Sequence, residues 1–201
     1  MRGAISRKIL ADGAAGLGVT LGERAAERLT RYIELILKWS RRVDLTGLTT
    51  PEAVANRLIL DSLALVRAIA HADSVIDVGS GAGIPGIPLA VARPDLRVTL
   101  VEPRERRAAF LRTAIDVLGI DARLLAVRLE AVDERFDWVV SKAFLPPEKW
   151  VVAARRLARP GGRIALWTHR PTTLEANERI AYRLPDGSDG LVEVFHVKQS
   201  T

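Results

Sequence analysis

Hydrophobic and polar residues follow two different patterns along this chain, and the change comes near residue 73. In the first part, residues 22–39 place apolar side chains at helical spacing, with arginine and glutamate between them: Leu29, Ile33, Ile36 and Leu37. A second helix is predicted over residues 51–70, because Thr50 suits an N-cap and Pro51 suits a first turn. We therefore expect residues 1–72 to form a helical cap and residues 73–201 to form the main domain.

From residue 74, short apolar runs alternate with helical stretches, a pattern typical of a parallel sheet with crossover helices. The runs predicted as parallel strands are residues 74–79, 97–102, 122–127, 136–141 and 162–168. Helices are predicted between them over residues 87–94, 104–119 and 148–162. Two last runs, 178–185 and 191–197, flank the turn-rich PDGSDG and predict an antiparallel pair. The expected fold is a Rossmann-like α/β sheet of seven strands with a C-terminal hairpin, the arrangement of class I S-adenosylmethionine (SAM)-dependent methyltransferases.

Composition narrows the classes of function. The chain has 201 residues, which is enough for one catalytic domain with a sizeable core. It has no cysteine, and its histidines are far apart in sequence (His71, His169 and His196), so we expect no metal site. Asp12 interrupts the basic N-terminus before any signal-peptide core, and no run is long enough to cross a membrane. A cytoplasmic protein that does not bind membranes is expected.

Charge points to an anionic partner. Lys and Arg number 30 and Asp and Glu 24, which gives a net charge of +6. Such a balance favours nucleic acid, although arginines scattered over a solvated surface would give the same number. A candidate RNA-binding cluster follows the second predicted strand: Arg104, Arg106 and Arg107.

The stretch IDVGSGAGIPG, residues 76–86, is the strongest candidate for a ligand site. It is not a phosphate-binding Walker A loop, because Gly86 is followed by Ile87 and Pro88 rather than by Lys and Ser or Thr. The glycines at 81, 83 and 86 do match the spacing of a dinucleotide-binding loop. Glycine spacing alone therefore leaves a dinucleotide, SAM or a ligand-free turn open.

Two acidic residues separate these possibilities. Asp77 precedes the first glycine, where its carboxylate would repel a pyrophosphate but attract the ammonium and sulfonium groups of SAM. Glu102 ends the second predicted strand, where it is placed to accept hydrogen bonds from ribose hydroxyls of either ligand. Together they favour SAM, held by Asp77, Glu102 and the loop glycines, with Gly81 and Gly83 among them.

Further candidates follow the third and fourth predicted strands. Leu129 is placed to pack on an adenine face and Glu130 to meet its amino group, although a solvated turn explains both equally well. Lys142 leaves the fourth strand, where it is a candidate for positioning the cofactor or an RNA phosphate. Asp61 lies in the apolar run LILDSLAL and is expected to join the helical cap to the main domain. No residue pattern indicates a catalytic base.

These residues resemble a known family. The runs WSRRVDLTGLTTPEAVANRLILDSLAL, SVIDVGSGAGIPGIPLAVARPDLRVTLVEPRERRAAFLR and FDWVVSKAF are similar to the ribosomal RNA small-subunit methyltransferase G family, also called GidB. The resemblance implies a SAM-dependent enzyme that methylates N7 of a guanine in 16S rRNA, on free rRNA or on the small subunit. It also implies cofactor contacts at Gly79, Ile84, Leu129, Glu130 and Lys142. A ring nitrogen with a free lone pair needs no base, which agrees with the residues found.

The chain departs from the family pattern mostly on the expected substrate side. The departures are Ser40 and Asp44 where the family has asparagine, Leu58 where it has histidine, Lys142 where it has arginine, and Thr168 and His169 after the fifth strand. They leave open two other functions: a methyltransferase of a different substrate, and a SAM- and RNA-binding protein of the ribosome without catalysis. A monomer is expected.

Overall fold

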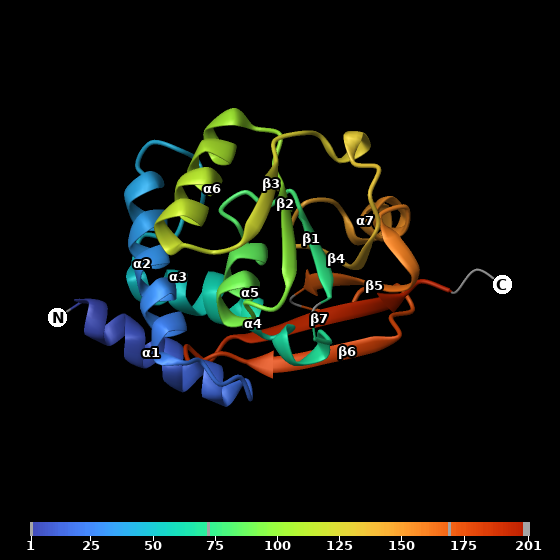
Figure 1. The fold of residues 1–201 in the computed structure, drawn as a ribbon. Coiled ribbons are helices and arrows are strands. Elements are labelled where there is room, and N and C mark those ends of the chain that lie inside the picture. Colours follow the sequence, from blue (N-terminus) through green and yellow to red (C-terminus); the bar gives the residue numbers. More distant parts are fainter. Residues whose placement is uncertain (1, 72, 169, 199–201) are drawn as a thin grey trace.

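The chain folds around a single seven-stranded sheet (Figure 1), as a computed structural model describes it for residues 2–71, 73–168 and 170–198. The strand order is β3-β2-β1-β4-β5-β7-β6. The strands are β1 (Ser74–Val78), β2 (Arg97–Val101), β3 (Ala122–Leu125), β4 (Phe136–Ser141), β5 (Ala158–Thr168), β6 (Glu178–Arg183) and β7 (Asp189–His196). The first five are parallel and β7 pairs antiparallel with both β5 and β6, so the predicted fold class is confirmed.

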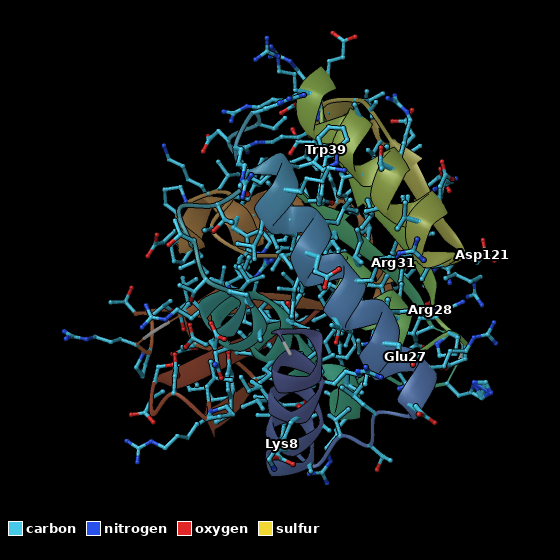
Figure 2. The ribbon with its side chains drawn as sticks, turned by 90° about the vertical axis from the view of Figure 1, so that its left-hand side faces the viewer. Lys8, Glu27, Arg28, Arg31, Trp39 and Asp121 are labelled. Atoms are coloured by element: carbon cyan, nitrogen blue, oxygen red, sulfur yellow. The ribbon has the colours of Figure 1, made fainter. Side chains whose placement is uncertain are left out.

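Helices cover both faces of this sheet (Figure 1). The helical elements are α1 (Arg2–Gly16), α2 (Glu23–Trp39), α3 (Pro51–Val54), η1 (Ala55–Leu60), α4 (Asp61–Leu63), η2 (Val66–Ala68), α5 (Gly86–Ala92), α6 (Glu105–Leu118), η3 (Leu129–Ala131) and α7 (Pro147–Arg155). The helices from α1 to α6 share one hydrophobic cluster with one face of the sheet, and α7 shares a second cluster with the other. Figure 2 shows α2 beside α6, where the Arg28 guanidinium donates to the Gly119 carbonyl (3.0 Å).

Residues 51–70 do not form the single helix predicted for them. Thr50 does cap the first turn, since its hydroxyl accepts from the Ala53 N–H (3.2 Å). The backbone then passes through a π-helix over Ala55–Leu60, a short α-turn and a 3₁₀ turn. A π-helix adds a residue to the turn and rotates the side chains that follow, and such insertions concentrate at functional sites. Here the residue that follows is Asp61.

The structure also differs from prediction around β5 and at the N-terminus. The helix predicted over residues 148–162 is wrong beyond Arg155, because β5 already begins at Ala158 and takes in the Pro160-Gly161-Gly162 turn as an irregular strand end. Helix α1 was not predicted at all. Its sequence has little helical periodicity of apolar residues. In agreement, only a few of its described side chains are buried, Leu10 and Ala14 among them.

One core spans the boundary expected at residues 72 and 73. Leu10 and Leu29 from the N-terminal helices belong to the same cluster as Val75 of β1 and Leu100 of β2. The division into a cap and a main domain stays a prediction. Within the described ranges, no helix is long and apolar enough to cross a membrane, and no group of three histidine or acidic side chains could hold a metal ion. His169, one of the three histidines considered for a metal site, lies outside those ranges.

Candidate functional site

The glycine loop joins β1 to α5 at the carboxyl edge of the sheet, where open α/β sheets bind ligands. Its backbone has positive φ at Gly79 (71°), Gly81 (55°) and Gly83 (79°). The loop is fixed to the neighbouring strand because the N–H groups of Gly79 and Ser80 both donate to the Val101 carbonyl (2.9 and 3.0 Å). The loop is therefore shaped by its own hydrogen bonds before any ligand is added.

Asp77 lies beneath this loop with none of its surface exposed. Its Oδ2 accepts from the Gly86 N–H (2.9 Å) at the start of α5, and its Oδ1 has no hydrogen-bond partner among the described residues. Burial raises the pKa of Asp77 to about 7, although the Gly86 hydrogen bond opposes the shift. The carboxyl thus holds the two ends of the loop together. A direct contact with a cofactor stays a prediction.

Glu102 holds the loop from the second strand. It is almost fully buried, and its Oε2 accepts from the Gly81 N–H (3.0 Å) while its Oε1 accepts from the Arg104 N–H (2.9 Å). Each carboxylate oxygen has a second lone pair, so both oxygens retain capacity for a hydroxyl donor. The ribose role predicted for Glu102 is compatible with this geometry.

Phe144, which is not among the predicted site residues, lies directly on Gly79. A Cβ at Gly79 would sit 2.3 Å from Cδ2 of Phe144, so only glycine admits the ring. The chain reaches this place through Ala143, whose φ of 56° is left-handed, and the ring makes an edge contact with Trp150 (6.1 Å between centroids). Phe144 stays 36% exposed at the edge of the sheet. The sequence feature that could have indicated Phe144 is its place three positions past a predicted strand, in a chain with only four phenylalanines.

The two residues predicted after the third strand lie differently. Leu129 is 7% exposed and packs in the cluster beneath α7, and its carbonyl accepts from the Arg156 guanidinium. Glu130 is exposed. Ile84, in the glycine loop, is 6% exposed. Their contacts with a cofactor remain predictions, and for Leu129 the adenine face would have to meet a side chain that is already packed.

Lys142 is held by the helical cap. Its Nζ forms an ion pair with Oδ2 of Asp61 (2.6 Å) and donates to the Arg57 carbonyl (2.7 Å). Asp61 is 7% exposed and also accepts from the Tyr182 hydroxyl (2.6 Å). Its own carbonyl accepts from the Trp167 indole (2.9 Å). Asp61 of α4 is thus linked to Lys142 after β4, to Trp167 of β5 and to Tyr182 of β6, and the Lys142 ammonium points toward α4.

The residues that depart from the family pattern have different local surroundings. Asp44 accepts two hydrogen bonds from Arg107, one at its carbonyl and one at Oδ2 (2.9 Å each), so one arginine of the predicted RNA-binding cluster is engaged. The hydroxyls of Ser40 and Thr168 are buried without a partner among the described residues. Leu58 lies half-buried against the main core.

Comparison with known proteins identifies this arrangement. Residues 25–182 match the family GidB, described as rRNA small subunit methyltransferase G. The chain belongs to this family. The matched range takes in the glycine loop, both buried aspartates and the strand end that carries Lys142.

Curated relatives bear the same description as the GidB family. Ribosomal RNA small subunit methyltransferase G of Myxococcus xanthus is 36% identical over 92% of this chain and 94% of its own length. The protein of that name from Anaeromyxobacter dehalogenans is 42% identical over 78% of this chain and 76% of its own length. The one from Neisseria gonorrhoeae is 41% identical over 76% of this chain and 75% of its own.

Solved structures extend the likeness to the fold. A 16S rRNA methyltransferase of T. thermophilus, in complex with AdoMet and guanosine, superposes with a TM-score of 0.55 at 19% identity, over 78% of this chain and 45% of that chain. A toxoflavin-precursor N-methyltransferase of Burkholderia thailandensis, with S-adenosylhomocysteine bound, gives 0.51 at 17% identity, over 69% and 77%. The GidB chain therefore has the fold of the class I SAM-dependent methyltransferases.

Proposed function

We propose that this chain transfers a methyl group from SAM to N7 of a guanine in the 16S rRNA of the small ribosomal subunit. The observation that carries the proposal is its membership of the GidB family across residues 25–182, with the glycine loop of that family intact and braced by two buried acids. The proposal includes the substrate that the relatives' names state, and it adds the ring position.

The residues at the carboxyl edge fit SAM. The glycine loop leaves its backbone open to a ligand at Gly81, where an added Cβ would meet no atom nearer than 3.7 Å, and Glu102 keeps lone pairs for ribose hydroxyls. When bound, SAM supplies a methyl carbon on a positively charged sulfur. The exposed Phe144 ring beside Gly79 provides an apolar wall that excludes water from this part of the edge.

Catalysis by this chain then rests on positioning. N7 of guanine attacks with its own lone pair, so no side chain has to remove a proton before transfer. This fits a site whose charged groups hold backbone rather than face open space, as Asp77 and Lys142 do. Orientation and exclusion of water supply the rate in such a reaction.

The decisive experiment uses purified protein, labelled SAM and small subunits from cells that lack the gene. We expect the label in rRNA, and after digestion to nucleosides we expect it in 7-methylguanosine. Label in another nucleoside, or in a small molecule or protein, would instead support a methyltransferase of a different substrate. Stoichiometric binding of SAM and RNA without any transfer would support a binding protein.

A matched pair of variants ties the activity to the described site. Glu102→Gln loses the charge that holds Gly81 and faces the expected ribose, so SAM affinity should fall by about 10-fold or more. Glu105→Gln removes the same charge from an exposed position in the first turn of α6 and should leave SAM affinity unchanged. Isothermal titration measures both, and equal affinities would contradict the assignment of Glu102.

We further infer that the chain acts as a monomer in the cytoplasm, where its proposed substrate is found. Either free 16S rRNA or an assembled subunit satisfies the proposal. A comparison of methyl transfer rates on the two substrates separates them.

A further inference from the structure

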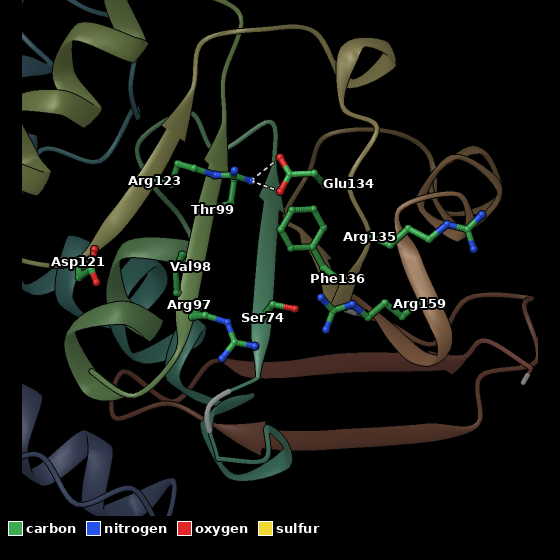
Figure 3. A pocket seen from close by; sticks show the side chains of 10 residues that line it. All are labelled: Ser74, Arg97, Val98, Thr99, Asp121, Arg123, Glu134, Arg135, Phe136 and Arg159. Carbon is green, nitrogen blue, oxygen red and sulfur yellow. Dashed lines mark hydrogen bonds and ion pairs between the residues drawn. The ribbon is translucent and has the colours of Figure 1, made fainter.

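A hollow of about 330 Å³ lies on the opposite edge of the sheet from the glycine loop. Its lining residues, which Figure 3 labels, come from the amino ends of the parallel strands and the links that precede them. β1 begins at Ser74 and ends one residue before Gly79, so the two edges are separated by five strand residues, roughly 15 Å. The hollow is thus separate from the proposed cofactor site.

Four arginines from four separate segments surround this hollow, which we call the arginine hollow (Figure 3). They are Arg97 at the start of β2, Arg123 in β3, Arg135 before β4 and Arg159 in β5. All four are exposed. Arg97 and Arg159 converge on Asp137, at 4.0 and 2.9 Å, while Figure 3 shows Arg135 reaching outward on the side of α7.

Positive charge exceeds negative charge in the arginine hollow. Its lining holds four arginines against Asp121 and Glu134. Glu134 forms an ion pair with Arg123 (2.8 Å), and Asp137 behind the lining pairs with Arg159. Arg97 has only the 4.0 Å contact, and the Arg135 guanidinium forms no hydrogen bond or ion pair with the described residues. Exposed ion pairs contribute only about 0–1 kcal/mol, so a phosphate can compete for these guanidinium groups.

The lining chemistry selects the class of ligand. Guanidinium groups present planar donor forks that match the oxygens of a phosphate. The polar lining and the open position on a sheet edge suit an extended anion better than an enclosed small molecule, since small-molecule pockets are mostly apolar and bury their ligands. The net charge of +6 favours an extended polyanion in the same way.

We propose that the arginine hollow binds the sugar–phosphate backbone of the RNA substrate, at a segment away from the methylated guanine. The inference rests on the proposed rRNA substrate and adds a second contact on the opposite edge of the sheet. Arg97 and Arg135 are the residues available to phosphate. Arg123 and Arg159 also bind phosphate once RNA displaces their carboxylate partners. The hollow carries no base-reading role in this proposal, because contacts to phosphate fix position without reading sequence.

The test compares RNA binding of the wild type with that of the Arg97→Gln/Arg135→Gln variant. Affinity for a 16S rRNA fragment is measured by filter binding at several salt concentrations. Loss of two phosphate contacts should reduce the slope of log affinity against log salt by about 1 to 2. Affinity near 100 mM salt should fall by about 10-fold or more. SAM affinity, measured by titration, should not change, because the hollow lies on the far edge.

A matched control removes the same charge elsewhere. Arg7→Gln/Lys8→Gln loses two cations from α1, which Figure 3 shows well apart from the hollow and Figure 2 shows with Lys8 labelled. We expect the control to keep the wild-type slope. An unchanged slope in Arg97→Gln/Arg135→Gln, or an equal loss in the control, would overturn the proposal.

The same data separate this inference from the proposed function. If the wild type binds the RNA fragment with a steep salt dependence and the hollow variant does too, only the arginine hollow fails. If the wild type shows no salt-dependent binding to rRNA at all, the proposed substrate fails and the hollow loses its ligand with it.

Discussion

Asp77 and Asp61 are both buried, but their neighbouring groups give the two carboxyls different roles. Asp77 receives one hydrogen bond from Gly86 and leaves Oδ1 without a partner among the described residues, so burial dominates and its pKa rises to about 7. Asp61 is nearly as buried but meets the Lys142 ammonium and the Tyr182 hydroxyl. Burial and the adjacent Asp61 raise the pKa of Tyr182 far above its ordinary value, so Tyr182 stays a donor.

The raised pKa of Asp77 predicts a pH-dependent stability. The folded state binds the proton more tightly than the unfolded state, so the stabilisation is fully present below about pH 4 and is lost as pH rises through 7. The amide in Asp77→Asn does not titrate, so this variant lacks the pH dependence. Between pH 4 and 8, the free energy of unfolding of the wild type should therefore fall by up to roughly 4 kcal/mol relative to that of Asp77→Asn, as measured by urea denaturation. Parallel pH profiles would contradict this.

The Asp61 cluster predicts a large cost for removing one partner. Asp61→Ala leaves the Lys142 ammonium, whose side chain is 22% exposed, without its anion and the Tyr182 hydroxyl without its acceptor. The free energy of unfolding should fall by roughly 3 kcal/mol, as measured by urea denaturation. The double variant Asp61→Ala/Lys142→Met removes both charges and should be more stable than Asp61→Ala alone. If Lys142→Met brings no recovery, the ion pair does not carry the effect.

Among the elements, those with a strong local signal were predictable and those set by tertiary contacts were not. The five parallel strands and the hairpin follow from alternating apolar runs, and α6 ends at Gly119 with a left-handed φ of 57°, as its glycine indicates. Helix α1 has no such signal, since it packs on η1 through close contact rather than a broad apolar face. The break after Val54 and the early start of β5 likewise depend on neighbours distant in sequence.

Two glycines of α1 predict opposite effects of the same substitution. A Cβ at Gly13 would lie 2.3 Å from Cδ1 of Leu60, whereas one at Gly16 would meet nothing within 4 Å. Gly13→Ala should push α1 from η1 and lower the free energy of unfolding by about 1 kcal/mol or more, despite alanine's better helix propensity. Gly16→Ala should raise it by up to about 0.5 kcal/mol. Thermal melts of both variants test whether α1 packs as described.

In the whole molecule, the sequence predicts which residues meet at one edge of the sheet, where we propose the cofactor site, but not which groups their charges contact. The glycine loop, Asp77, Glu102 and Lys142 were all predicted to lie at one edge, and all do, because parallel strands end together. Their partners were not predictable, since Gly86, Gly81 and Asp61 are chosen by tertiary packing. The arginine hollow was also invisible in the sequence, because its four arginines lie in four segments.

We propose that this GidB protein adds a methyl group to N7 of a guanine in small-subunit rRNA. The most direct measurement is mass spectrometry of nucleosides from the 16S rRNA of cells with and without its gene. We expect that one 7-methylguanosine per 16S rRNA disappears with the gene and returns when the wild-type chain, but not Glu102→Gln, is supplied. An unchanged level of 7-methylguanosine in the rRNA of cells without the gene would contradict it.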